Sequence, residues 1–422
     1  MNKKNRVGFW CAAVAPLVTA WSGIALAHPY IVIDLGPTPA GFQPVTATGT
    51  SLNSHGQVAG IFSGAEAVAA IGTAGGGVRT VVARDLSSEL GGINESGNVV
   101  GFLQPTESSD SRAFFFAGDK LVFMGTLGGA WAMATAISNT NLATGDSADA
   151  SGVQTAFLWN GSSMIAVPTP PGAISSGSGV SDNGNVTGVV GFGSDPGSDY
   201  QAFVWKGRQM ILLEGGLFSQ SNAVNNDGVV VGESDFGAGI GFQATMWTAS
   251  GTRVNLAPAG STFSEALAIN NAGVIVGSAT IESASFATHA YVWKHGTATD
   301  LGSLLPDGVE SIASNISDAG AVLGLTLPNT SGNEVIEWAP SVPVALDALL
   351  GQVRGIGPGE SLTIKVWEAL ATYAVKDTRG TCGALTAFAS EVKALDGKKI
   401  GQALAGRLLS NAGAIEAATG CR

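Results

Sequence analysis

One short pattern of apolar and polar positions recurs along the chain. An aliphatic residue is followed by a cluster of Asn, Asp or Ser, a turn residue, two or three small or β-branched residues, and a closing glycine. This order is typical of a β-hairpin, because Asn, Asp and Gly tolerate the backbone angles of a tight turn. The closing glycines are Gly60, Gly101, Gly145, Gly188, Gly232, Gly277 and Gly324, at spacings of 41, 44, 43, 44, 45 and 47 residues. Seven copies at so narrow a period indicate an internal repeat.

A short aromatic strand follows each predicted hairpin. The clear copies run from Ala to Trp at 156–159, 202–205, 244–247 and 290–293, with looser copies at 113–116 and 335–338 and a degenerate one near Ala67. A fourth strand then ends in segments such as Asp300-Leu301-Gly302. Four strands in about 44 residues predict a β-propeller blade, so the fold class is mainly β, with seven blades in a ring. We expect the aromatic side chains to pack between blades rather than to form a carbohydrate-stacking platform, because they recur in nearly every copy.

Two segments are candidates for the strand that closes the ring. Residues 31–36 precede the first hairpin and end in Asp34-Leu35-Gly36, which matches the fourth-strand ending at 300–302. Residues 342–346 are the alternative, since they follow the last aromatic strand. Either arrangement would hide a sheet edge, which matters for a protein with so much β-surface.

The repeat resembles the HAF-type extracellular repeats. The resemblance is carried by Ile-Asn-Asn-x-Gly-x-x-x-Gly at 269–277, by the Ala-Phe-x-Trp strands, by the Asp-Leu-Gly endings, and by His289-Ala290-Tyr291 where the family has His-Ala-Phe. It covers roughly residues 30–350. The resemblance implies a secreted bacterial protein without a defined biochemical activity, and it supplies no catalytic residues.

Residues 1–27 have the features of a secretory signal peptide. A basic start from Lys3 to Arg6 precedes an apolar stretch that ends in Ala-Leu-Ala at 25–27. An uncleaved membrane helix is the alternative, and the small residues at the end favour cleavage. We therefore expect a secreted protein, periplasmic or extracellular, with no stable membrane insertion after cleavage.

The pattern changes to helical spacing after about Pro343. Leu346, Leu349 and Val353 are spaced as in a helix, and residues 361–375, 382–395 and 400–418 predict three more helices. The predicted domains are a signal peptide at 1–27, a propeller at 28–342 and a small helical bundle at 343–422.

Cleavage of the signal peptide would leave two cysteines, Cys382 and Cys421. Two cysteines in an exported chain most simply form one disulfide. They lie at the start of one predicted helix and the end of the last, and these ends meet if the two helices are antiparallel. We therefore predict a Cys382–Cys421 disulfide.

Charge and composition exclude some functions. The chain has 20 Lys+Arg against 32 Asp+Glu, a net charge of −12 that becomes −15 without residues 1–27, and this balance disfavours a nucleic-acid partner. Hydrophobic residues make up 45% of the chain, which is enough for a large core. The sequence contains neither a nucleophile elbow paired with a histidine nor a phosphate-binding loop. We predict no catalytic residue and no cofactor.

No metal site is predicted either. The four histidines are His28, His55, His289 and His295, of which the last three fall in predicted turns or just before a strand. His28 would become the N-terminal residue after cleavage, and copper binding there needs a second histidine that nothing in the sequence marks. The Asn/Asp turns lack the carboxylate spacing of a calcium loop, so we interpret them as turn formers.

Two function classes remain. The first is a non-enzymatic binding scaffold for an unknown extracellular polymer or protein. The second is a hydrolase or lyase that acts on an extracellular polysaccharide, with channel carboxylates as acid and base. The regular loops, rich in Gly, Ser, Ala and Thr, favour the scaffold, and the most polar irregularity lies at 193–200.

Overall fold

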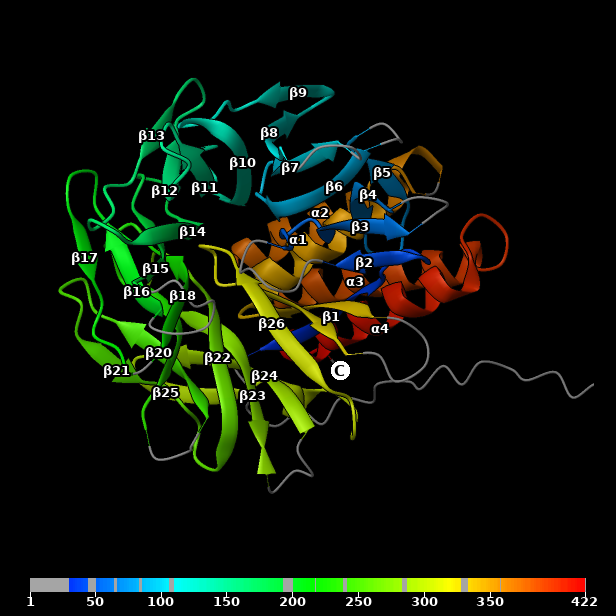
Figure 1. The fold of residues 1–422 in the computed structure, drawn as a ribbon. Coiled ribbons are helices and arrows are strands. Elements are labelled where there is room, and N and C mark those ends of the chain that lie inside the picture. Colours follow the sequence, from blue (N-terminus) through cyan, green and yellow to red (C-terminus); the bar gives the residue numbers. More distant parts are fainter. Residues whose placement is uncertain are drawn as a thin grey trace, which may run out of the picture.

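The computed structural model describes most of the chain after residue 29. The described ranges are 30–44, 51–63, 67–82, 86–105, 110–192, 200–216, 218–237, 241–282, 287–327, 333–356 and 358–421. The predicted signal peptide, His28 and residues 193–199 of the polar loop lie outside these ranges. The described residues form seven four-stranded antiparallel sheets around a ring, followed by four α-helices (Figure 1). The predicted seven-bladed propeller with a C-terminal helical region is confirmed.

The blades follow one another along the chain, and we number them 1 to 7. Blade 1 consists of β2 (Phe42–Pro44), β3 (Gln57–Ser63), β4 (Ala67–Thr73) and β5 (Val78–Thr80). Blade 2 consists of β6 (Leu86–Ile93), β7 (Val99–Pro105), β8 (Arg112–Ala117) and β9 (Lys120–Phe123). Blade 3 consists of β10 (Gly128–Ile137), β11 (Ala143–Asp149), β12 (Gln154–Trp159) and β13 (Met164–Ala166). Blade 4 consists of β14 (Ile174–Val180), β15 (Val186–Gly191), β16 (Tyr200–Trp205) and β17 (Met210–Leu212). Blade 5 consists of β18 (Ser219–Val224), β19 (Val230–Asp235), β20 (Phe242–Trp247) and β21 (Arg253–Asn255). Blade 6 consists of β22 (Ser261–Ile269), β23 (Ile275–Ile281), β24 (Ala287–Lys294) and β25 (Thr297–Asp300). In each of these blades the first strand is the innermost strand of the ring.

Blade 7 joins the two ends of the propeller. It contains β26 (Ser311–Ile316), β27 (Val322–Thr326), β28 (Glu334–Ala339) and, as its outermost strand, β1 (Ile31–Pro37). β1 runs antiparallel to β28, with Ile31 opposite Ala339 and Pro37 opposite Glu334. The N-terminal strand therefore closes the ring. The alternative closure by residues 342–346 is wrong, because these residues begin a helix that tolerates Pro343 in its first turn.

The predicted packing of aromatic residues between blades is confirmed. Five of these side chains are completely buried: Phe114, Phe157, Phe203, Trp247 and Trp338. The blade 3 residues Phe157 and Trp159, for example, share a cluster with Val100 and Ala113 of blade 2. Burial of one such side chain stabilises the fold by about 1.5–3 kcal/mol, so the aromatic repeat holds neighbouring blades together.

Four helices complete the chain, and they lie close to the predicted positions. They are α1 (Val342–Val353), α2 (Ser361–Ala374), α3 (Thr378–Leu395) and α4 (Gln402–Thr419). α3 begins four residues before the predicted Cys382, because the Asp377 carboxylate caps it by accepting a hydrogen bond from the Gly380 N–H. Cys382 and Cys421 form the predicted disulfide, with their Cα atoms 5.5 Å apart. Among the described helices, none is both long and apolar enough to span a lipid bilayer.

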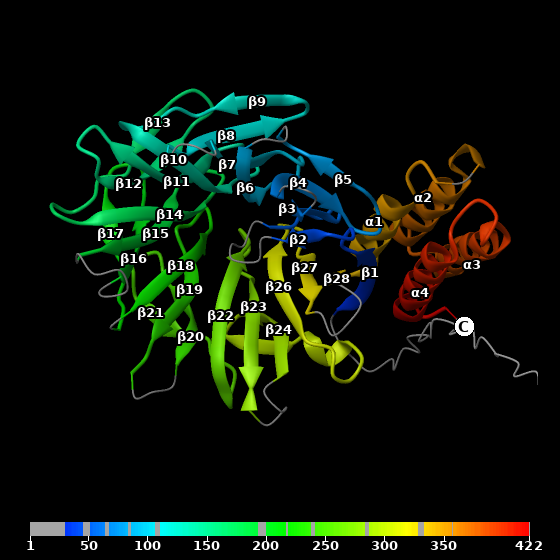
Figure 2. The same cartoon turned by 45° about the vertical axis from the view of Figure 1, so that its right-hand side comes forward.

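The helices pack against the strand that closes the ring (Figure 2). β1 is an edge strand, and Asn411 of α4 pairs with its main chain at Asp34. The Asp34 N–H donates to Asn411 Oδ1 at 3.1 Å, and Asn411 Nδ2 donates to the Asp34 carbonyl at 2.8 Å. The side-chain amide thus takes the place of a further strand at this point of the edge. One hydrophobic cluster runs without a break from β1 and blade 1 into the four helices.

Candidate functional site

The first Asn of the repeat has two structural roles. Asn270 Oδ1 accepts the N–H groups of Ala272 and Val274 at 3.1 and 2.9 Å, which shapes its own turn. Asn270 Nδ2 donates to the Ser317 carbonyl of blade 7 at 3.0 Å. Equivalent links between blades start from Asn53, Asn94 and Asn225. The predicted role in the turn is confirmed for these four, and the link to the next blade is a role that sequence reasoning missed.

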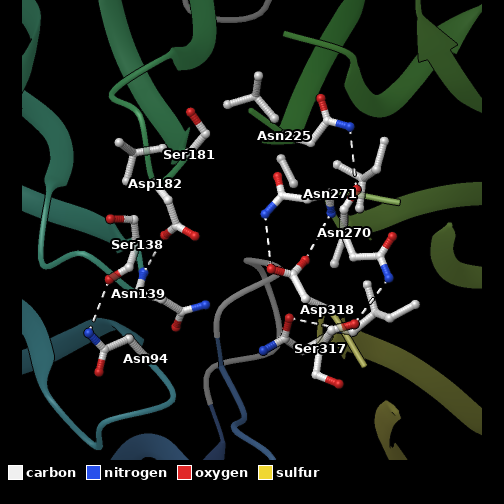
Figure 3. Close-up of a pocket in the computed structure, with 18 of the residues that line it drawn as sticks. Asn94, Ser138, Asn139, Ser181, Asp182, Asn225, Asn270, Asn271, Ser317 and Asp318 are labelled. Carbon is white, nitrogen blue, oxygen red and sulfur yellow. Dashed lines mark hydrogen bonds between the residues drawn. The ribbon is translucent and has the colours of Figure 1, made fainter. Parts of the chain in front are cut away.

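The second residue of several turns also links neighbouring blades. The Asn139 N–H donates to Asp182 Oδ1 at 2.8 Å, and the Asn271 N–H donates to Asp318 Oδ1 at 3.0 Å. Figure 3 shows these side chains around one mouth of the central channel, which holds a cavity of about 110 Å³. These oxygen atoms already accept hydrogen bonds from neighbouring blades. The primary role of the residues at this mouth is therefore structural, because they hold neighbouring blades together. We call it the Asn-turn mouth.

His55 and His295 lie in turns as predicted, whereas His289 lies within β24 rather than before a strand. His289 Nδ1 lies 2.9 Å from Asp300 Oδ2, so this side chain bonds within the outer half of blade 6. His295 has a φ of 50° in the exposed β24–β25 turn. His55 lies in the first Asn turn, with its side chain 55% exposed. Within the described ranges, no three His, Cys, Asp or Glu residues come close enough to hold a metal ion.

Several carboxylates are buried in the strands, and sequence reasoning missed them. Asp146 of β11 and Glu233 of β19 each directly follow a closing glycine. Burial raises the pKa of Asp146 to about 6, although a hydrogen bond from Ser176 acts in the opposite direction. Burial and the nearby charge of Glu265 raise the pKa of Glu233 to about 7. The position of these residues in the repeat could have revealed them, because the other five blades have Ile61, Phe102, Val189, Ser278 and Leu325 there.

A second cavity is formed mainly by residues of blade 3. It has a volume of about 420 Å³ and is lined by Ser111, Trp131, Met133, Asp146 and Gln154. We call it the Trp131 cavity. Trp131 and Met133 lie on the innermost strand β10, Asp146 on β11 and Gln154 on β12.

Hydrogen bonds hold the carboxylate of the Trp131 cavity in place. Gln154 Nε2 donates to Asp146 Oδ2 at 3.0 Å, and Ser176 Oγ donates to Asp146 Oδ1 at 3.0 Å. Asp146 is only 4% exposed. A fixed planar carboxylate beside an indole ring is the mixture of polar and apolar groups that small-molecule sites use.

The lining of both cavities is acidic. The Asn-turn mouth contains Glu95, Asp182 and Asp318, the Trp131 cavity contains Asp146, and no lining residue of either is basic. The charged groups that line the two cavities are thus all negative, and walls of low dielectric constant strengthen the negative potential that they create.

Fold and channel define the class of this molecule as a seven-bladed β-propeller with a C-terminal helical region that contains a disulfide. No protein-family model matches the chain, and no curated protein matches it. Among solved structures, it is similar to the acylaminoacyl peptidase of Pyrococcus horikoshii, with 9% identity, a TM-score of 0.40, and coverage of 65% of this chain and 49% of the peptidase. It is also similar to prolyl oligopeptidase B of Galerina marginata, with 10% identity, a TM-score of 0.44, and coverage of 72% and 49%.

A third similar structure is YCF48 bound to D1 peptide, with 14% identity, a TM-score of 0.41, and coverage of 74% of this chain and 97% of that one. The matches to the two peptidases thus span about half the length of those proteins. At these identities and TM-scores, the similarities say nothing about what this chain binds or does.

Proposed function

We propose that this chain is a secreted, HAF-type repeat protein that acts as a non-enzymatic binding scaffold for an extracellular polymer or protein. The observation that carries the proposal is the composition of the Trp131 cavity. Asp146 is its only side chain that titrates near neutral pH, and the others are an indole, a thioether, an amide and a hydroxyl group. Such groups bind and orient a ligand, whereas acid–base catalysis needs a second proton donor or acceptor within reach.

Two further observations support secretion and the family. The Cys382–Cys421 disulfide is of the kind that persists in oxidising compartments. The His289–Asp300 contact joins the His-Ala-Phe-like motif to the Asp-Leu-Gly ending within one blade. This contact gives a physical reason for the two motifs to occur together in a repeat.

A hydrolase or lyase is the second candidate, and Glu233 and Glu265 favour it. They belong to neighbouring blades 5 and 6, and Glu233 Oε2 is buried without a hydrogen bond. Burial also raises the pKa of Glu265. Two carboxyl groups whose pKa values are both raised by burial can supply a protonated acid near neutral pH.

One experiment separates the two candidates. The exported protein is applied to an array of glycans and cell-wall polymers, and the supernatant is assayed for new reducing ends and unsaturated products. The scaffold predicts retention on at least one polymer without products, and weaker retention for Asp146→Asn. The fully exposed Asp119 provides a charge-matched control, Asp119→Asn, which should bind as the wild type does.

Products that disappear in Glu233→Gln and Glu265→Gln would establish the enzyme and overturn the scaffold. The absence of retention on every polymer would overturn the polymer form of the proposal. A screen for protein partners would then test its remaining form.

A further inference from the structure

Among the described residues, no positively charged side chain pairs with the buried Asp146 carboxylate. Its two oxygen atoms accept hydrogen bonds from Gln154 and Ser176, both of which are neutral. Buried charges in proteins are normally paired with an opposite charge, because removing an ion from water is expensive. The structure therefore provides a negative group, held in place by two donors, whose counter-charge is missing.

The strands that surround Asp146 cannot supply this counter-charge. β10, β12 and β14 pack against β11, and they present Trp131, Met133, Gln154 and Ser176 to this region. These three strands contain no Asp, Glu, Lys, Arg or His at any position. No other titrating group on them competes with Asp146 for a proton or for a cation.

The apolar wall of the cavity suits a cation with alkyl substituents. The face of an indole ring attracts cations more strongly than other aromatic rings do, and a thioether is soft and polarisable. Trp131 and Met133 provide these two groups beside the carboxylate. A neutral sugar could also lie against an indole, but it would leave the buried charge uncompensated.

From this juxtaposition we propose that the Trp131 cavity binds an alkylammonium group, which lies against the Trp131 indole and pairs with the Asp146 carboxylate. The inference rests on the proposed binding function and names the chemistry of its ligand. Amino-sugar polymers and choline-type headgroups both carry such a group, and the experiment distinguishes them.

The test is calorimetric titration of the full exported chain with matched pairs of probes. Choline is compared with 3,3-dimethylbutan-1-ol, which has the same shape without the charge. The N-trimethylated glucosamine dimer, whose charge does not depend on pH, is compared with cellobiose. At pH 7.5 we expect the better cation to bind about tenfold more tightly than its neutral counterpart, as a desolvated cation–π contact and an ion pair allow. Whichever cation binds more tightly identifies the source. Equal affinities within both pairs would overturn the inference.

Protonation and substitution provide independent readouts. Burial raises the pKa of Asp146 to about 6, so the advantage of the cation should largely disappear at pH 5, where the carboxyl group is protonated. Asp146→Asn should abolish the advantage at pH 7.5, Trp131→Leu should reduce it, and Asp119→Asn should leave it unchanged. Because the pH series uses the wild-type protein, the inference stays testable even if a variant fails to fold.

Failure of this inference differs from failure of the proposed function. Retention on the polymer array that Asp146→Asn weakens, together with equal affinity for charged and neutral probes, would keep the scaffold and reject the cation. A loss of both signals would reject both.

Discussion

Blades 6 and 7 carry the same Asp-Leu-Gly ending but complete it in different ways. In blade 6, His289 bonds to Asp300, and its ring lies so close to Gly302 that a Cβ there would be 2.6 Å from the ring Cγ. In blade 7, Asp34 and Gly36 are the equivalent residues, as the pairing of Asp34 with Ile336 and of Asp300 with Tyr291 shows.

In blade 7, the side chain that packs beside the Asp-Leu-Gly ending is Arg407, which belongs to α4. Glu334 occupies the position that His289 has in blade 6, two residues before the paired residue of the third strand. Arg407 of α4 packs on Gly36 instead, where a Cβ would lie 2.9 Å from the guanidinium carbon. The positive charge of Arg407 acts to lower the pKa of Asp34 and Glu334, although burial outweighs it for both. The helical region thus supplies side chains that complete the last blade.

The largest expected effect concerns Glu337 of β28, whose counterpart in blade 6 is the apolar Val292. Glu337 is 1% exposed, and burial together with the charges of Asp347 and Glu95 raises its pKa to about 8. The folded state therefore binds this proton more tightly than the unfolded state does. Stability should be highest below the ordinary carboxyl pKa, and it should fall by at most about 5 kcal/mol as pH rises from there through 8.

Glu337→Gln removes this titration. Its unfolding midpoint in urea should exceed that of the wild type at pH 8.5. It should change less between pH 5 and 8.5 than that of the wild type does, although Asp146 and Glu233, with pKa values of about 6 and about 7, still titrate in this range. The exposed Glu282 provides the control Glu282→Gln, which should follow the wild type. A wild-type protein that is equally stable at both pH values would contradict the burial of an ionisable group here.

The second prediction concerns Asn411, which has no equivalent in blade 6. Asn411→Ala leaves the N–H and carbonyl groups of Asp34 without their partner, at a cost of about 3 kcal/mol for the two groups. Denaturant unfolding measures this loss, and Asn160→Ala in an exposed turn is the control. A change as small as that of the control would show that the amide does not cap the edge.

The two glycines of the shared ending allow a direct comparison. Gly36 has a φ of 109°, and a Cβ there would also lie 3.0 Å from the Cα of Gly75, so Gly36→Ala combines backbone strain with a clash. At Gly302, which has no positive φ, the three atoms nearest to an added Cβ all belong to the His289 side chain. We expect losses of about 2–3 and about 1–2 kcal/mol respectively.

Gly296→Ala isolates the backbone strain, because Gly296 has a φ of 78° and open space around it. A loss for Gly36→Ala no greater than that for Gly296→Ala would mean that Arg407 does not pack against this glycine.

The smallest effect is expected from the His289–Asp300 pair. Its two side chains are 21% and 30% exposed, and such pairs contribute about 1 kcal/mol or less. His289→Gln should therefore shift the unfolding midpoint less than Asn411→Ala does. A larger shift would mean that the His289–Asp300 contact stabilises the protein more than the contact of Asn411 with β1 does.

The fold was predictable because the hairpin pattern occurs seven times in the sequence. Each Asn turn and each aromatic strand obeys local rules of hairpin formation and burial, so chance matches are averaged out. The closure by residues 31–36 was one of two open alternatives, and the pairing of β1 with β28 decides between them. Secretion and the signal peptide stay predictions.

The functional residues were less predictable for a physical reason. Asp146 departs from the repeat at a single position, and its burial depends on how strands of two blades come together around it. Arg407 and Asn411 belong to α4, where no repeat marks them, and Asn411 meets a residue 377 positions earlier in the chain. Sequence patterns report local order, whereas these contacts arise only when the ring is closed.

The most direct test of the binding role is a crystal structure of the protein with the polymer or cation that it retains. We predict ligand density in the Trp131 cavity, between the indole ring and Asp146. Density only at the Asn-turn mouth or on the outer strands, with an empty Trp131 cavity, would contradict the assignment of this site.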